Sequence, residues 1–126
     1  MPRRDAPAPA PIEPARSPCP IASALDLLGD KWTLIVVRDL LLFDKHRFAD
    51  LLASGEGIST NVLAERLARL EAAGLVVRRR YQERPPRDEY HLTPCGRDLL
   101  PVLREMIAWG NRHIPGTLRP PPGWRR

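Results

Sequence analysis

Cysteine and long apolar runs are both scarce in this sequence. The chain has two cysteines, Cys19 and Cys95, which are too few for a disulfide framework and lack the paired spacing that marks a zinc site. No apolar stretch reaches the roughly 18 residues of a membrane-spanning helix. Residues 1–18 also lack the apolar centre of a signal peptide. These absences predict a cytoplasmic protein with no cofactor, no metal and no membrane partner.

Residue combinations that carry catalysis are absent as well. Three histidines, His46, His91 and His113, are expected in a loop, a strand and a helix end, where a solvated or hydrogen-bonded role is more common than metal ligation. The serines have no convincing histidine and carboxylate partners, and there is neither a phosphate-binding glycine loop nor a pair of catalytic acids. We therefore do not expect an enzyme.

Positive charge is abundant and unevenly distributed. The formal net charge is +5 and the sequence pI is near 10.0. Residues 78–87 hold five arginines and one glutamate, a local net charge of 5 − 1 = +4. Concentrated positive charge attracts polyanions such as nucleic acids, although it does not determine the fold.

Proline is concentrated at the two ends of the chain. Six of the 15 prolines lie in residues 1–18 and four lie at or after position 115. Neither end has a periodic apolar face that would offset the entropy of ordering. A chain of 126 residues has room for one domain with a modest core. We expect a disordered tail over 1–18, one domain over 19–114 and a basic, proline-rich tail over 115–126.

Two helices are predicted at the start of the domain. Pro20 suits a first helical position, and Gly29 is expected to end this helix after Leu28. Residues 31–43 would be apolar around most of a helix, which predicts a centrally buried helix. A buried strand is the alternative, because residues 35–37 are β-branched.

A helix-turn-helix is predicted next. Residues 47–54 place apolar side chains at helical spacing, and two glycines permit the turn that follows. The second helix, 59–73, has Ser59 as its expected N-cap and Gly74 as its expected end. Its buried face repeats at helical spacing and consists of Leu63, Leu67 and Leu70.

A β-hairpin follows the second helix. Residues 75–82 and 88–93 are predicted strands, with Pro85 and Pro86 at the tip, where no ladder donor is needed. Because neighbouring strand residues point to opposite faces, the arginines at 78–80 cannot all address one surface. At least one of them is expected to pair with Asp88 or Glu89.

A last helix completes the predicted fold. Thr93 is its expected cap, Pro94 its first residue, and Pro101 inside it is expected to produce a kink. The order of elements defines the fold class as α+β, mostly α: a winged helix-turn-helix with additional helices at both ends.

The second helix of this motif enters the DNA major groove, N-terminal residues first. With the leucines turned to the core, a helical wheel points one side of residues 59–73 outward. An asparagine there can pair with adenine and a glutamate can accept from cytosine, whereas the hydroxyls at the helix start suit phosphate equally well. Arginines at the wing tip are expected to contact phosphate or the minor groove, an ordinary solvated loop being the alternative. The expected DNA contacts are Ser59, Thr60, Asn61, Glu65, Arg69, Arg84 and Arg87.

Residues 19–110 resemble the HxlR-type transcriptional regulators, a branch of winged-helix proteins related to MarR-like repressors. Residues 44–46 depart from the family's glycine-containing approach to the next helix, which affects only the local turn. The resemblance rests on Cys19 and Pro20, GDKW at 29–32, Arg47 and Phe48, GISTNVLAERLARLEAAGLV at 57–76, PPRDEYHLTPCGRDLLPVL at 85–103, and Trp109 with Gly110.

The resemblance implies a bacterial, nucleoid-associated homodimer that binds an inverted repeat in double-stranded DNA. It also places Arg66 near the DNA backbone, although the helical wheel puts this residue beside the core, so that its side chain must reach outward or anchor the helix. Repression is expected, because a dimer that occupies a promoter needs no further domain. A winged-helix module that binds protein without specific DNA binding is the alternative.

Dimers of such regulators are built from the N-terminal helices and the C-terminal helix. Both segments of this chain offer more apolar surface than a small domain readily covers. The alternative is that these residues fill the core of their own domain. The expected dimer residues are Leu25, Leu28, Trp32, Leu99, Leu103, Met106, Ile107 and Trp109.

Cys19 is a candidate redox sensor. Some proteins of the family sense quinones, aldehydes or disulfide stress through a cysteine at this position, which makes a small molecule or an oxidant a candidate effector. Cys19 would lie at a helix N-terminus, whose dipole favours the thiolate. Simple packing is the alternative, and Cys95 is a much weaker candidate.

Overall fold

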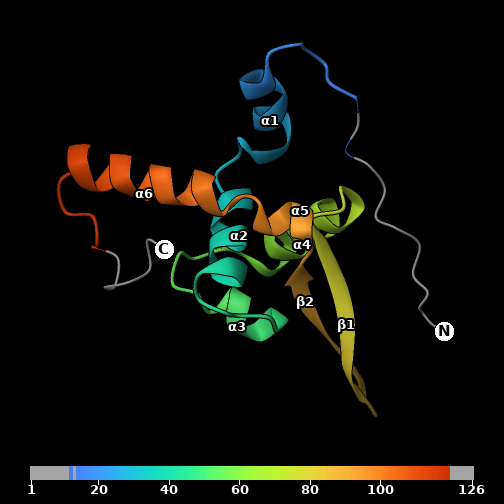
Figure 1. Ribbon diagram of the computed structural model, residues 1–126. Helices are drawn as coiled ribbons and strands as arrows, with labels where there is room; N and C mark the ends of the chain where they lie inside the picture. The colour runs from blue at the N-terminus through green and yellow to red at the C-terminus, as the bar shows by residue number, and fades with distance from the viewer. Residues whose placement is uncertain (1–11, 13, 120–126) are drawn as a thin grey trace.

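In the computed structural model, residues 12 and 14–119 are described, and they form six helices and one two-stranded sheet (Figure 1). Helix α2 lies at the centre, α1 and the β-hairpin extend from opposite ends of the body, and α6 projects to one side. The tails predicted over 1–18 and 115–126 lie largely outside the described residues and stay predictions. The elements are α1 Pro20–Leu28, α2 Thr33–Leu41, α3 Phe48–Leu52, α4 Thr60–Ala72, β1 Val76–Glu83, β2 Pro86–Leu92, α5 Pro94–Arg97 and α6 Leu100–His113.

The central element α2 is a helix, so the helix prediction for residues 31–43 is confirmed and the strand alternative is wrong. Its Val36, Val37 and Leu40 are at most 3% exposed and form the middle of the core. Asp39 is also buried, and its carboxylate accepts hydrogen bonds from the Arg38 guanidinium at 3.0 and 2.9 Å. The buried charge is therefore paired, as burial requires.

Helices α3 and α4 form the predicted helix-turn-helix. The Ser59 hydroxyl caps α4 by accepting from the Val62 N–H at 3.2 Å, which confirms the expected N-cap. Gly74 adopts a φ of +82°, which confirms its role at the helix end, because this region favours glycine. The three leucines predicted to seat α4 are fully buried: Leu63, Leu67 and Leu70.

The wing is the antiparallel pair β1 and β2, with Val76 opposite Leu92 and Arg79 opposite Glu89. Val76 and Leu92 are buried and attach the base of the hairpin to the core. Residues toward the tip lie outside the core and project from the body (Figure 1). Strand β2 begins at Pro86, two residues earlier than predicted, and leaves only residues 84 and 85 at the tip.

The C-terminal region differs from the expected single kinked helix. The cap is confirmed, because the Thr93 hydroxyl accepts from the Gly96 N–H at 3.2 Å. Helix α5 then ends at Arg97, and α6 begins at Leu100. Pro101 occupies the first turn of α6, where the missing N–H would have no helical partner. The expectation of a continuous helix kinked by Pro101 is therefore wrong: the chain begins a new helix at this proline.

Candidate DNA-binding surface

The outward side of α4 has the composition expected for a DNA-reading helix. Thr60, Asn61 and Glu65 are exposed, and between them Ala64 adds only a small exposed side chain. The backbone N–H groups of the first turn of α4 have no acceptor within the helix, and the Ser59 side chain accepts from one of them, the Val62 N–H. This end of α4 therefore presents hydrogen-bonding side chains together with the positive end of a helix dipole.

Two arginines of α4 bind within the protein. The Arg66 Nε donates to Asp30 Oδ1 at 2.9 Å, and Arg66 also pairs with Glu65. The Arg69 guanidinium donates to the Leu27 carbonyl at 2.9 Å and lies 3.6 Å from Asp30 Oδ2. The expectation that Arg69 points outward is therefore wrong. For Arg66, the alternative in which the side chain anchors the helix is the one observed.

Asp30 is the acceptor that gathers these groups. Its carboxylate also accepts from the backbone N–H groups of Trp32 and Thr33, at 2.8 and 3.0 Å, and from the Thr33 hydroxyl at 2.5 Å. Partial burial would by itself raise the pKa of Asp30. The hydrogen bonds from Thr33, Arg66 and the backbone outweigh burial and hold the pKa of Asp30 well below its usual range.

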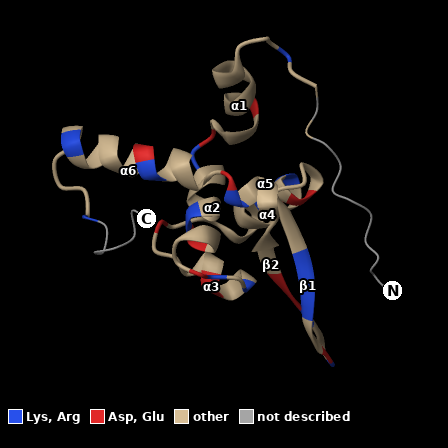
Figure 2. Ribbon diagram, in the orientation of Figure 1, with Lys and Arg blue, Asp and Glu red and all other residues tan. Residues whose placement is uncertain are grey.

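The wing arginines divide into paired and unpaired groups. Arg80 binds Asp88 at 2.8 Å, which confirms the expected pairing with an acidic residue of the opposite strand, and Arg78 binds Glu71 of α4 at 3.3 Å. Figure 2 shows the resulting basic stretch on β1 beside acidic residues on β2. Among the described residues, no carboxylate pairs with the remaining three, and all are exposed: Arg79, Arg84 and Arg87.

The wing is held by residues 44–46, the segment that departs from the family's pattern. The His46 carbonyl accepts from the Tyr90 N–H at 2.8 Å, and the His46 Nδ1 lies 2.9 Å from the Tyr90 carbonyl. A carbonyl only accepts, so Nδ1 carries the hydrogen. The His46 ring also stacks on His91, with ring centroids 4.2 Å apart. His46 thus attaches the segment before α3 to β2 through one backbone hydrogen bond and one bond from its ring.

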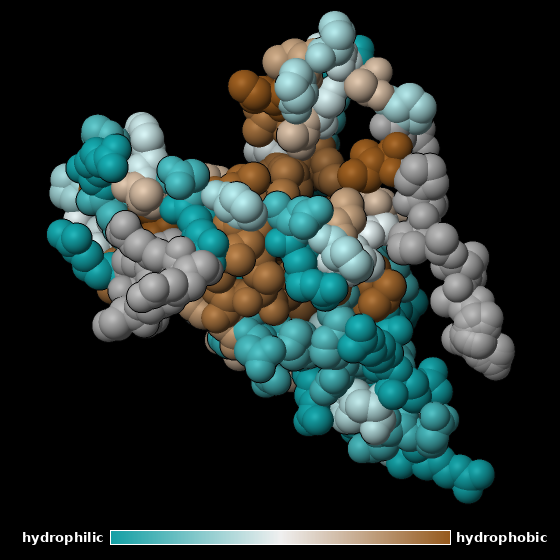
Figure 3. Space-filling view, in the orientation of Figure 1, coloured by the Kyte–Doolittle hydropathy of each residue, from teal (hydrophilic) through white to brown (hydrophobic). Residues whose placement is uncertain are grey.

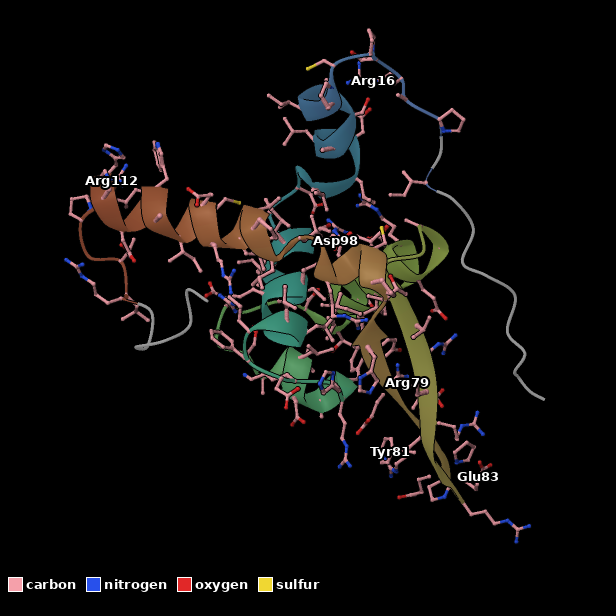
Figure 4. All side chains as sticks on the ribbon, in the orientation of Figure 1. Arg16, Arg79, Tyr81, Glu83, Asp98 and Arg112 are labelled. Atoms are coloured by element: carbon pink, nitrogen blue, oxygen red, sulfur yellow. The ribbon has the colours of Figure 1, made fainter. Side chains whose placement is uncertain are left out.

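Arg47 lies against the outer part of the wing. In the sequence it stands out only as one of the residues that carry the family resemblance. Its guanidinium is 4.2 Å from the centre of the Tyr81 ring and 3.4 Å from Glu89. The hydrogen bond from His91 lowers the pKa of Glu89, and the one from Arg47 adds to this effect. Figure 4 shows Tyr81 and Arg79 along the hairpin and Glu83 nearer its tip. Arg47 therefore braces the wing against α3 while remaining half-exposed.

A continuous apolar surface covers the opposite end of the molecule. One groove lies between α1 and α6 and is lined by Ile21, Leu25, Leu28, Val102 and Met106, among others. A second hollow runs along α6 and shares Val102 and Met106 with the first. Figure 3 shows hydrophobic surface between α1 and α6, in contrast to the hydrophilic wing.

The expected dimer residues fall into three groups. Leu25, Met106 and Trp109 are 55–59% exposed, although they are large and apolar. Leu103 is buried in the core, so for this residue the alternative of an intradomain role holds. The four others are partly buried: Leu28, Ile107, Trp32 and Leu99. Of these, Trp32 and Leu99 pack on the core.

Both cysteines are exposed and free. Cys19 is the N-cap of α1, and its Sγ accepts from the Ala22 N–H at 3.5 Å. Within the described residues, no group of three or more His, Cys, Asp and Glu side chains is placed to hold a metal ion. No helix in that part of the chain is long and apolar enough to cross a membrane.

The helix-turn-helix and the wing together define a winged helix-turn-helix protein of the MarR-like type. The chain belongs to the HxlR-like helix-turn-helix family, whose model matches residues 27–117. This membership confirms the predicted family and identifies a transcriptional regulator rather than an enzyme.

Individual relatives agree with this assignment. The chain is 43% identical over 93 residues to an HTH-type transcriptional regulator of Synechocystis sp., covering 74% of this chain and 68% of the relative. It is 38% identical over 101 residues to one of Mycobacterium tuberculosis, covering 80% of this chain but only 63% of that longer protein.

Two solved structures also share the fold. The reduced form of the transcriptional regulator YodB from Bacillus subtilis is 34% identical, with a TM-score of 0.64, and the match covers 79% of this chain and 98% of that one. The oxidised form of the redox regulator HypR is 34% identical, with a TM-score of 0.64, over 75% of this chain and 97% of that one.

Proposed function

We propose that this regulator binds double-stranded DNA sequence-specifically, as a homodimer on an inverted-repeat operator, and represses transcription by occupying the promoter. One observation carries the proposal: the exposed polar side of α4 and the unpaired wing arginines Arg84 and Arg87 belong to the two elements that a winged helix applies to DNA. In this proposal Asn61 and Glu65 face base edges, Ser59 and Thr60 face phosphate, and the wing tip grips the backbone.

The proposal is tested by measuring binding to the DNA upstream of the protein's own gene and of neighbouring genes, over a salt series. For a DNA reader, log K falls with log salt by about 0.9 per phosphate neutralised, and a specific site exceeds bulk DNA by about a thousandfold or more. A shallow slope without site preference contradicts the proposal. That result would favour the alternative, a winged-helix module that binds protein. The unpaired arginines on the wing argue against this alternative, since protein binding does not require them.

The dimer part of the proposal rests on the surface between α1 and α6. Leu25, Met106 and Trp109 leave large apolar side chains in water, which a second copy would cover about a two-fold axis. Two half-sites would then lie about one DNA turn apart, roughly 34 Å. Sedimentation equilibrium tests this step. Met106→Glu should shift the protein toward monomer, whereas Leu118→Glu, at a residue 91% exposed and outside both hollows, should not. Equal effects, or a monomeric wild type, contradict it.

Oxidation at Cys19 is the form of regulation that we propose for the dimer. Cys19 is exposed at the start of α1, beside the groove formed by α1 and α6, where modification would alter the packing of α1. HypR, a redox regulator with the same fold, supports this expectation. Operator binding of the wild type and of Cys19→Ser is to be compared during titration with hydrogen peroxide or diamide. An oxidant response that survives the substitution rules Cys19 out.

We also propose that the domain extends over residues 19–114.

A further inference from the structure

The Asp30 carboxylate joins three helices at one point. It lies in the turn between α1 and α2 and accepts from both N–H groups at the start of α2. The same carboxylate holds Arg66 of α4 at 2.9 Å and lies 3.6 Å from Arg69, one turn further along. Arg69 in turn donates to the Leu27 carbonyl in the last turn of α1. Both arginines of this side of α4 are therefore held by the last turn of α1 and the α1–α2 turn, where they share one carboxylate.

This attachment adds a directional restraint on α4 to the packing of its buried face. Leu63, Leu67 and Leu70 set how deeply α4 sits, but aliphatic packing has little directional preference. A helix side chain ends about 6 Å from the helix axis, so a rotation of α4 by about 20° moves it by about 2 Å. Such a displacement breaks hydrogen bonds, which tolerate only a few tenths of an ångström. Bonds at two successive turns thus define the rotation of α4 about its axis.

We propose that Asp30 is a positioning residue for DNA recognition, which fixes the rotation of α4 so that Asn61 and Glu65 meet base edges. The inference rests on the proposed DNA-binding function. It also assigns Arg66 and Arg69 to the interior of the protein's own architecture, so that neither neutralises a phosphate in the complex. Asp30 itself touches no DNA in this account.

The test compares Asp30→Asn with Asp26→Asn. Both substitutions remove one negative charge from neighbouring positions of the same segment, but Asp26 pairs with Arg16 at 2.7 Å and makes no bond to α4. Binding is measured to the duplex that the wild type selects and to a random duplex of equal length, between about 0.1 and 0.5 M salt. Asp30→Asn should lower the ratio of specific to random affinity about tenfold or more, because a misplaced base contact costs about 1–3 kcal/mol. Asp26→Asn should leave the ratio unchanged.

The salt slope separates positioning from a merely structural effect. Asp30→Asn removes the carboxylate that Arg66 and Arg69 share, while Arg66 keeps its pair with Glu65 and Arg69 keeps its bond to the Leu27 carbonyl. The slope of log K against log salt should therefore steepen by up to about 0.9 for each of the two guanidinium groups that then reaches a phosphate. Arg69→Gln provides an independent measurement, which decides alone if Asp30→Asn does not fold. Arg69→Gln should reduce the ratio of specific to random affinity without lowering the salt slope. If Arg69 bound a phosphate, the substitution would instead lower that slope by about 0.9.

The outcomes are distinct. If Asp30→Asn and Asp26→Asn show the same ratio and slope, or if Arg69→Gln lowers the slope, the positioning role of Asp30 is overturned and the proposed function stands. If the wild type prefers no duplex, the proposed function itself fails.

Discussion

The two unpaired arginines at the wing tip provide a quantitative prediction. We expect the double substitution Arg84→Gln and Arg87→Gln to remove two phosphate-binding groups. The matched control is Arg78→Gln with Arg80→Gln, which removes the same charge from the same hairpin. In the control the two arginines are already bound to carboxylates, at 3.3 and 2.8 Å.

The magnitude follows from counterion release. Without these two groups, the slope of log K against log salt should fall by about 1.8, which at 0.1 M salt corresponds to about 60-fold in affinity relative to a 1 M reference. Random and specific duplexes should be affected about equally, because phosphate binding carries no base information. The control pair should change the slope by less than about half a unit, since arginines that are neutralised within the protein release few counterions.

Fluorescence anisotropy with both duplexes, at five or more salt concentrations, is a suitable assay. Circular dichroism of each variant verifies that the hairpin remains folded. Equal slopes for the two double variants would contradict the prediction, because the pairing of the wing arginines would then not determine which of them reach DNA. An unchanged slope for the tip variant would show that the wing does not contact the backbone.

Two further predictions concern stability. The pKa of Asp30 is depressed, so its carboxylate stabilises the fold above the ordinary carboxyl pKa of about 4, and this contribution is lost as the pH falls toward the lower folded-state pKa. In urea unfolding, Asp30→Asn should lower the free energy of unfolding by about 2 kcal/mol at pH 7. The difference in unfolding free energy between variant and wild type should become smaller below about pH 4, and a difference that does not change with pH would contradict the prediction. Gly96→Ala should destabilise by about 1–3 kcal/mol, because its Cβ would lie 2.3 Å from the Leu75 carbonyl oxygen. Gly110→Ala, whose Cβ meets nothing within 4 Å, should be neutral or stabilising by up to about 1 kcal/mol, so similar costs at the two glycines would count against the packing argument.

Local signals in the sequence were sufficient for most of the fold. Capping by Ser59 and Thr93 and the glycine end of α4 depend on residues within a few positions, and the structure places them as predicted. The buried face of α4 follows from spacing alone. Pro101 was misplaced because a proline in an apolar helical pattern has two outcomes, a kink or a new helix start. The short turn at Asp98 and Leu99 decides between them.

The candidate site was less predictable because its organisation depends on long-range contacts. A helical wheel places Arg69 outward, but it cannot show that Asp30 and the Leu27 carbonyl lie beside it, about 40 positions earlier in the chain. The wing support by His46 and Arg47 was missed for the same reason. The short polar segment before α3 offered one usable signal, because its departure from the family pattern marked it as a local peculiarity.

The claim that the outward side of α4 reads DNA bases is tested most directly at Asn61. Affinities of the wild type and Asn61→Ala are measured for a set of operators in which each base pair of both half-sites is replaced in turn, with Asn111→Ala on α6 as the control. We predict that Asn61→Ala abolishes discrimination at one symmetry-related base position, worth about 1–3 kcal/mol, and leaves the other positions unchanged. A uniform loss of affinity across all operators, or a preference profile identical to that of the wild type, would contradict it.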